Sequence, residues 1–258
     1  MESCLVYESP SVWGFLVGVL LALGIYVSYV PQHVKIINRR TSEGLSPLFL
    51  FLGSTSGFSA FVNLLLTTAP ARQCCVSELD RFQCLNSQVG LIQVGVQTVG
   101  YTLILVLCAH LTRPRIETPD SDGAKIARSY KWFLVYAGVN LAIAVYFLVF
   151  VTDYSKTLKF ANLSGLVSTV LATGQYLPQI HTTYVLKHPG SLSVHMMMLQ
   201  TPGGYLWCYS LFMQPGSRWS SWLPYFTAAS LQLILLLMCL YFRETHPEQQ
   251  NDGSPLLV

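Results

Sequence analysis

The fold is decided by the stretch SVWGFLVGVLLALGIYVSYVPQ, which runs from Ser11 to Gln32. The stretch contains no charged residue, and it has about the 20 residues that an α-helix needs to cross the hydrocarbon core of a bilayer. It ends on Pro31 and Gln32, a helix-breaking residue beside a side-chain amide. The same pair recurs at Pro178-Gln179. The sequence therefore indicates a recurring element, a membrane helix with a proline break near its end.

The composition extends this interpretation to the whole chain. Of the 258 residues, 52% are apolar and only 10% are charged. A soluble domain of this size would need a charged exterior, so the long uncharged stretches indicate a surface that faces lipid. Lipid offers no partners to backbone N–H and C=O groups, which leaves only helices or closed barrels. The apolar runs have the length of membrane helices rather than of barrel strands.

We therefore predict an all-α, polytopic membrane protein with seven transmembrane helices. The fifth helix is the least apolar, and its Ser, Thr and Gln side chains indicate a position inside the bundle rather than against lipid. The predicted helices span residues 12–32, 47–67, 88–111, 131–151, 160–179, 194–213 and 223–242.

An internal repeat organises these helices. A shift of 147 residues places the first Pro-Gln pair over the second, and the register also aligns several other residues. An even number of helices separates the two starts, so both copies face the same way in the membrane. The prediction is a 3+1+3 architecture, two parallel three-helix bundles joined by a linker helix. The aligned pairs include Gly18 with Gly165, Tyr29 with Tyr176, Leu45-Ser46 with Leu192-Ser193, and Gly57 with Gly204.

The predicted domains follow from this repeat. The first bundle, with a lumenal N-terminus, covers residues 1–111, and a cytosolic loop with the linker helix covers 112–155. The second bundle covers 156–242, and a disordered cytosolic tail covers 243–258. Gly57 and Gly204 are expected to be close-packing points in a symmetric contact within each bundle.

The two motifs Tyr29-Val30-Pro31-Gln32 and Tyr176-Leu177-Pro178-Gln179 each close a predicted helix before a short polar loop. This doubled pattern resembles the PQ-loop repeat family, which includes cystinosin and the lysosomal or vacuolar cationic amino-acid exporters. That family is similar in fold to the SWEET sugar carriers and the KDEL receptor. The resemblance covers about residues 12–242 and implies a membrane carrier. The doubled motif carries little information about the substrate.

Two interpretations of the Pro-Gln pairs are open. Proline removes an N–H donor and clashes with the carbonyl one turn earlier, so kinks are predicted near Val27 and Gly174. The resemblance implies that the pairs are hinges on which each bundle rocks during alternating access. The alternative is that each proline merely ends its helix at the membrane surface. The candidate hinge residues are Pro31, Gln32, Pro178 and Gln179.

Uncharged polar side chains within the predicted helices mark a candidate binding site. Such residues usually face a partner helix or a cavity. One interpretation is interhelical hydrogen bonding, worth roughly 0.6 kcal/mol per pair. The other is a pocket for a small solute near mid-membrane, and its candidate residues are Asn63, Gln97, Gln175, Tyr205 and Trp207.

The interiors of the predicted helices lack Asp, Glu, Lys and Arg. Cystinosin-like, proton-coupled members of the family use intramembrane carboxylates, so this chain departs from that pattern. The departure argues against a cationic substrate and against direct proton coupling through a carboxylate. Histidine titrates near neutral pH and is the alternative proton relay. The candidates His33, His181 and His195 lie near the cytosolic surface, where solvated histidines are ordinary.

The cationic residues orient the chain. With a lumenal N-terminus, ten Lys and Arg residues lie on the cytosolic side and five on the other, as the positive-inside rule favours. Four cysteines then lie in the lumen, where one or two disulfides are expected. These are Cys4, Cys74, Cys75 and Cys84. Zinc is the alternative, but the adjacent cysteines suit tetrahedral ligation poorly, and neither a metal nor a cofactor is expected.

The C-terminal tail carries a candidate address. Asp252 followed by Leu256-Leu257 resembles an acidic dileucine signal that a sorting adaptor reads on a cytosolic tail. Together with the lumenal cysteines, this signal favours a vacuolar or lysosomal membrane.

The leading functional prediction is a carrier for a small neutral or zwitterionic solute, with an amino acid as one candidate. The alternative is a lipid scramblase or a membrane-trafficking factor on the same scaffold. A carrier predicts one enclosed polar site made by both repeats, whereas a scramblase predicts a polar stripe that faces lipid. An enzyme is not expected, because no nucleophile–base set or phosphate loop is present, and nucleic acid has no basic platform to bind. The expected partners are the solute and the lipid bilayer, and the sequence does not define the oligomeric state.

Overall fold

The computed structural model describes residues 4–40, 42, 45–111, 121–187 and 194–245. Within these ranges every regular element is a helix, as the all-α prediction requires. The elements are the 3-10 helix η1 (Cys4–Tyr7) and the α-helices α1 (Val12–Arg39), α2 (Pro47–Thr67), α3 (Ala69–Ser77), α4 (Arg81–Leu111), α5 (Asp122–Phe150), α6 (Tyr154–Leu186), α7 (Val194–Phe212) and α8 (Trp219–Thr245).

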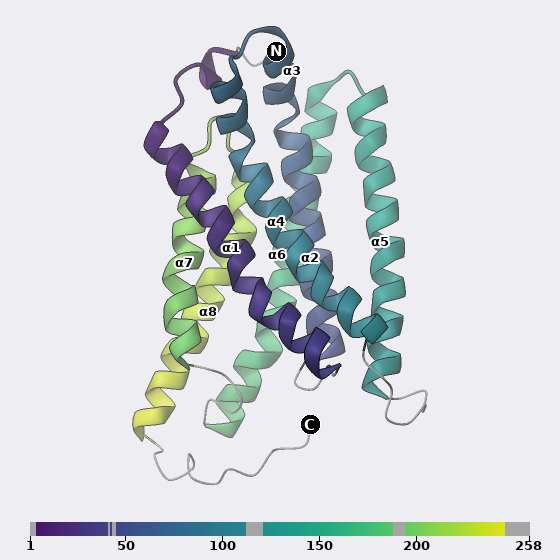
Figure 1. Cartoon of the computed structure of the whole chain (residues 1–258), viewed down its shortest axis with the longest axis vertical. Coiled ribbons are helices and arrows are strands. Elements are labelled where there is room, and N and C mark those ends of the chain that lie inside the picture. The colour runs from purple at the N-terminus through teal and green to yellow at the C-terminus, as the bar shows by residue number, and fades with distance from the viewer. Residues whose placement is uncertain (1–3, 41, 43–44, 112–120, 188–193, 246–258) are drawn as a thin grey trace.

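Seven of these helices lie along the long axis of the molecule, and α3 is a short helix near one end (Figure 1). Five of the described helices, α1, α2, α4, α5 and α8, are long and apolar enough to cross a membrane. The chain is therefore a helical membrane protein. Helices α6 and α7 are not among the five, which agrees with the predicted polarity of the fifth helix.

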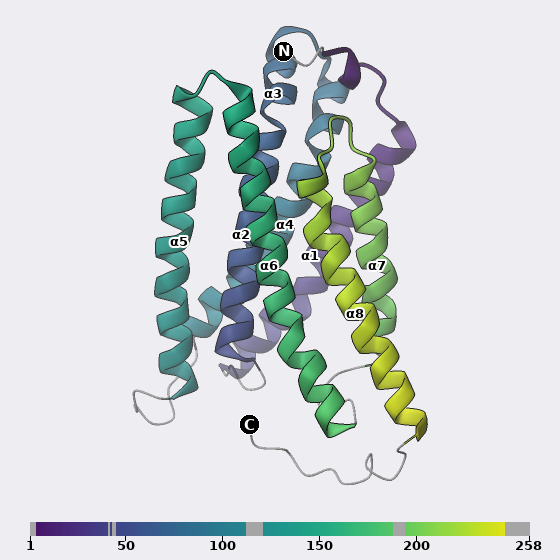
Figure 2. The same cartoon turned by 180° about the vertical axis from the view of Figure 1, so that it is seen from behind.

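Helix α6 is two-sided. Its Ser164 and Ser168 are buried in the bundle, whereas Leu163, Leu166 and Val170 are exposed. The prediction that this helix lies inside the bundle is thus correct for its polar face only. The exposed apolar side chains form the other face, and Figure 2 shows α6 from behind, where it passes in front of α2.

The two sequence repeats pack in the same order. Helix α4 packs between α1 and α2, and α8 packs between α6 and α7. Both leading helices, α1 and α6, begin at the end of the molecule where the N-terminus lies and run toward the other end (Figure 1). The two copies meet along an extensive α2–α6 interface, whereas α1 and α7 touch only slightly. Helix α5 packs against α2 and α4.

Repeat-equivalent glycines make equivalent contacts. A Cβ on Gly18 of α1 would overlap Val89 of α4, and a Cβ on Gly165 of α6 would overlap Ser220 of α8.

The same holds for the second helix of each copy. The Thr98 hydroxyl of α4 lies 3.5 Å from a Cβ built on Gly57, and Ala229 of α8 lies 3.2 Å from a Cβ built on Gly204. The symmetric contact predicted for Gly57 and Gly204 is confirmed.

The Pro-Gln pairs lie inside their helices and not at the ends. Helix α1 continues past Pro31 to Arg39, and α6 continues past Pro178 to Leu186. The predicted helix ends at residues 32 and 179 were therefore wrong, and so was the alternative in which proline ends each helix. Proline restricts the backbone one turn before it but leaves the following turns free to remain helical.

Both leading helices end alike. Arg40 and Lys187, which are 147 residues apart, take left-handed conformations with φ of 50° and 59°. Their backbone N–H groups donate to the carbonyls of Ile36 and Thr183, a C-cap that satisfies one of the last free carbonyls of each helix. The duplication thus extends to the backbone of the helix ends.

At the N-terminal end, the stretch predicted as a loop before residue 88 is mostly helical. It contains α3, and α4 begins at Arg81. Disulfides join Cys4 to Cys74 and Cys75 to Cys84. The four cysteines singled out in the sequence are thus paired with one another, and they fasten η1 to α3 and α3 to α4.

Candidate functional site

The tyrosines that precede the Pro-Gln pairs take part in the contact between the helix copies. Tyr29 of α1 packs against α4, where a Cβ on Gly100 would lie only 2.6 Å from its ring. Its ring centroid lies 6.4 Å from that of Tyr101, in an edge-to-face arrangement. Tyr176 of α6 lies in the neighbourhood of both Tyr29 and Tyr101. The equivalent tyrosines of the two repeats therefore lie in the same part of the molecule.

Tyr101 connects three helices. Gln175 of α6 donates from Nε2 to the Tyr101 hydroxyl at 2.9 Å, and that hydroxyl donates to the Phe49 carbonyl of α2 at 3.2 Å. The ring lies on Gly53 of α2, where a Cβ would overlap it. The glycine makes room for a tyrosine that bridges the two copies.

Tyr225 of α8 completes the arrangement. It is 9% exposed, and it lies in the neighbourhood of Tyr29. Its ring centroid lies 4.2 Å from that of Trp207 on α7. We call Tyr29, Tyr101, Tyr176 and Tyr225 the central tyrosine cluster. It draws one residue each from α1, α4, α6 and α8, two helices of each repeat.

Unpaired polar atoms lie in the same part of the structure. The Gln97 side chain lies near the Tyr29 hydroxyl, and its Oε1 is buried without a protein partner. Trp207 Nε1 and the Tyr225 hydroxyl are also buried without one. Buried polar atoms are rarely left unpaired, so this acceptor and these two donors remain available for hydrogen bonds to groups outside the protein chain.

Three of the five predicted pocket residues, Gln97, Gln175 and Trp207, thus contact the central tyrosine cluster. The other two make separate contacts. The Tyr205 hydroxyl bonds to Ser230 Oγ at 3.1 Å, which joins α7 to α8 within one copy.

Asn63 is a structural joint between α2, α6 and α8. Its side chain is completely buried. Its Nδ2 donates to the Ala161 carbonyl at 2.7 Å and to Ser220 Oγ at 2.9 Å, and its Oδ1 accepts from Ser221 Oγ at 2.9 Å. Interhelical hydrogen bonding, the simpler of the two sequence interpretations, describes this residue.

The same α2–α6 seam carries a reciprocal pair of serines. Ser56 Oγ donates to the Ser168 carbonyl at 2.9 Å, and Ser168 Oγ donates to the Ser56 carbonyl at 2.9 Å. The two helix copies are therefore fastened along one side by hydrogen bonds that are fully buried.

Replacing Asn63 by Leu is expected to destabilise the protein by about 2 kcal/mol, because three interhelical hydrogen bonds worth roughly 0.6 kcal/mol each are lost. Thermal unfolding of the purified protein in detergent measures this. Asn140→Leu is the matched control, because the Asn140 amide bonds to Tyr136 on its own helix. Equal losses of stability in the two variants would show that Asn63 is not a joint.

Two of the three histidines of the predicted proton relay have described side chains. His33 Nε2 lies 2.9 Å from the Gly100 carbonyl, so it fastens α1 to α4 just beyond the first Pro-Gln pair. His181 lies one residue beyond the position on α6 that corresponds to His33, and it is exposed. The side chain of His195 and the predicted sorting residues Asp252, Leu256 and Leu257 lie outside the described residues.

The sequence interpretation missed the tyrosines. Tyr29 and Tyr176 stand in register across the repeat, and that signal was sufficient to find them. Tyr225 offers no such signal, because the shift of 147 residues places it over Glu78 and not over a tyrosine.

Comparison with known proteins agrees with the duplicated fold. The family profile described as PQ loop repeat matches the chain twice, at residues 13–73 and 160–220. Each match covers most of a leading helix with its Pro-Gln pair and all of the next helix. An uncharacterized protein of Schizosaccharomyces pombe is 32% identical over 242 residues, which cover 88% of this chain and 80% of that protein.

Proposed function

The chain belongs to the PQ-loop repeat family, and on this premise we propose that it is a carrier that moves a small neutral or zwitterionic solute by alternating access. The family suggests a transporter-like function in a membrane. The observation that supports a carrier is the central tyrosine cluster, where both repeats contribute polar groups to one place and some of those groups lack protein partners. A polar meeting point between two like-facing bundles is where such a fold holds its substrate.

We propose a seven-helix, 3+1+3 arrangement in the membrane. In it, α6 and α7 cross together with the five apolar helices, and α5 is the linker between the copies. The parallel course of α1 and α6 supports it, as does the shared packing order of the copies (Figure 1). The disulfides at the N-terminal end favour a lumenal N-terminus, because disulfides persist in oxidising compartments. A vacuolar or lysosomal membrane fits this orientation.

The polar groups of the site define the substrate class. Its tyrosines, glutamines and tryptophan carry no charge. An ion with a net charge would find no counter-ion among them, and an unpaired charge inside a membrane is costly. A neutral or zwitterionic solute can instead exchange its hydrogen bonds with water for bonds to the amides and hydroxyls. Amino acids are the first class to test.

The test is uptake by the purified protein in liposomes, with amino acids, sugars and fluorescent lipids offered in parallel. Uptake of one soluble class, absent from empty liposomes, is the expected result. Movement of lipid without uptake of any solute would reject the carrier and favour a scramblase.

Gln175→Leu is expected to slow this uptake roughly tenfold, because a hydrogen bond worth about 1 kcal/mol is lost where the two copies meet, together with a polar group of the site. Initial rates over a range of solute concentrations measure it. Gln200→Leu is the matched control, because Gln200 pairs with Gln232 and is exposed, away from the cluster. Similar rates in the two variants would remove Gln175 from the site.

A further inference from the structure

The segment from Cys4 to Glu8 lies at the N-terminal end of the molecule and is fixed to the first helix copy. The disulfide between Cys4 and Cys74 ties η1 to α3. Tyr7 is only 3% exposed and packs in a cluster with Ala71 and Cys74. Just after it, the Glu8 carbonyl accepts a hydrogen bond of 2.9 Å from Gln83 Nε2 on α4. The segment therefore has covalent and polar anchors in α3 and α4.

The same segment also touches the second helix copy. Gly216 lies in the turn between α7 and α8, with a left-handed φ of 72°. A Cβ built on it would lie 2.7 Å from the Tyr7 hydroxyl. A side chain at this position would therefore be strained and would also displace Tyr7. Gly216 lets the turn approach the tyrosine closely, and this contact is not covalent.

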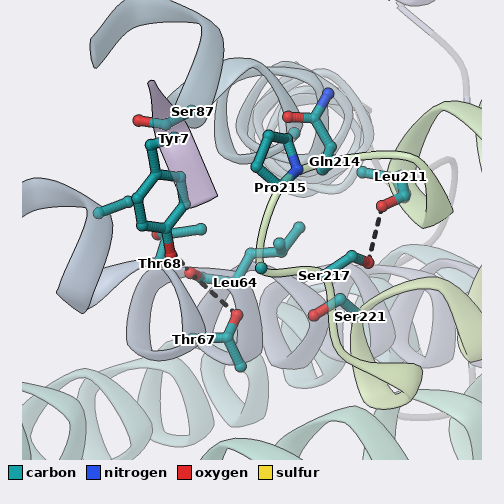
Figure 3. Close-up of a pocket in the computed structure, with 13 residues that line it drawn as sticks. Tyr7, Leu64, Thr67, Thr68, Ser87, Leu211, Gln214, Pro215, Ser217 and Ser221 are labelled. Atoms are coloured by element: carbon teal, nitrogen blue, oxygen red, sulfur yellow. Dashed lines mark hydrogen bonds between the residues drawn. The ribbon is translucent and has the colours of Figure 1, made fainter. Parts of the chain in front are cut away.

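Next to Tyr7 lies a small cavity with a mixed polar and apolar lining, which both copies provide (Figure 3). Its volume of about 20 Å³ matches a single water molecule. Thr67, Thr68 and Ser87 line it from the first copy, and Ser217 and Ser221 line it from the second. Gln214 also lines it, and its Oε1 is buried without a protein partner. Hydroxyl and amide groups of both copies thus surround this small space together with apolar side chains such as Leu64 and Leu211.

We propose that Cys4–Tyr7 is a latch that holds this cavity closed. One end is held covalently on α3 of the first copy, and Tyr7 rests on the α7–α8 turn of the second. The two copies can separate here only when Tyr7 leaves that turn. The latch rests on the proposed function in one respect: the carrier function is what makes this cavity an entrance to the solute path. The closure itself does not depend on any solute.

The test measures how readily the cavity opens. A thiol is introduced by Ser217→Cys in the full chain, because Ser217 lines the cavity. The purified protein reacts in detergent with a water-soluble maleimide, and mass spectrometry quantifies the label at position 217. This readout leaves the buried Cys108, Cys208 and Cys239 in place.

Removing the tether by Cys4→Ser with Cys74→Ser is expected to speed labelling roughly tenfold, because the opening equilibrium of a local contact sets the reaction rate. Tyr7→Ala keeps the disulfide and is expected to do the same. The matched control is Cys75→Ser with Cys84→Ser, which removes a disulfide that does not hold the segment. Its labelling rate is expected to stay at the level of the parent protein.

The latch would be overturned if neither the tether variant nor Tyr7→Ala sped up labelling at position 217. It would also be overturned if the control sped up labelling as much as these variants do. Uptake is measured separately. Faster labelling in a protein that moves no solute would retain the latch and reject the carrier, whereas solute uptake with an unchanged labelling pattern would do the reverse.

Discussion

Gly165→Ala is expected to destabilise the protein by about 1–3 kcal/mol, the usual cost of an added methyl group in a tightly packed interior. The new Cβ would overlap the Ser220 carbonyl oxygen and lie 2.8 Å from Ser220 Cβ and 3.0 Å from Asn63 Nδ2. A backbone carbonyl cannot rotate away as a flexible side chain does. Helices α6 and α8 would have to separate, and the Asn63 joint would be distorted with them.

Thermal unfolding in detergent measures this effect, with Gly138→Ala as the control. No atom lies within 4 Å of a Cβ built on Gly138 of α5. Alanine there is expected to leave stability unchanged or to raise it by about 0.5–1 kcal/mol, because glycine is a poor helix former. A Gly165 variant as stable as the Gly138 variant would mean that α6 and α8 are not in close contact at this point.

Replacing both Pro31 and Pro178 by alanine is expected to slow solute uptake about tenfold while leaving folding intact. Each proline lies inside a continuous helix and is exposed, so alanine costs no packing. It restores an N–H that can bond the carbonyl of Val27 or Gly174, at about 1 kcal/mol each. Both leading helices would be stiffer, so the activation free energy of the rocking motion would rise. A rise of about 1.4 kcal/mol corresponds to a tenfold slower uptake.

Pro202→Ala is the control for the hinges, because Pro202 also lies inside a helix and is exposed but has no counterpart in the first repeat. Uptake and thermal unfolding are measured on the same preparations. Single variants at Pro31 and Pro178 that transport at the parental rate would reject the hinge proposal. Loss of the folded protein would show instead that the prolines are structural.

The repeat was predictable from the sequence because it rests on residues whose physical role is the same in both copies. Gly18 and Gly165 permit close approach to a third helix, and each Pro-Gln pair is followed by a helix end with a left-handed cap. These roles restrict the backbone conformation and the size of the side chain, so the same residue types recur at a fixed spacing. The common packing order of the two copies follows from them.

The candidate site was less predictable, because the sequence does not distinguish a polar residue that bonds to a neighbouring helix from one that binds a solute. Asn63 and Gln175 both carry a side-chain amide inside a predicted membrane helix. Only the structure shows that Asn63 has three partners in other helices. It also shows that Gln175 bonds to the tyrosine that bridges the copies.

The predicted ends of the two leading helices were wrong for a related reason. A proline was read as the end of each leading helix, but the turns after it are held by contacts distant in sequence. His33 lies next to the Gly100 carbonyl, and Ile36 is 1% exposed in a core cluster with Leu105. Similarly, α3 is held by two disulfides whose pairing the spacing of the cysteines does not specify.

The reciprocal serines between α2 and α6 have a mechanical consequence. A buried interface fastened in both directions resists sliding and separation, so it is the natural axis for any relative rotation of the two halves. Displacement grows with distance from an axis, and α1 and α7, which touch only slightly, lie on the far side. The widest excursions are therefore expected along the α1–α7 edge, where few contacts must break.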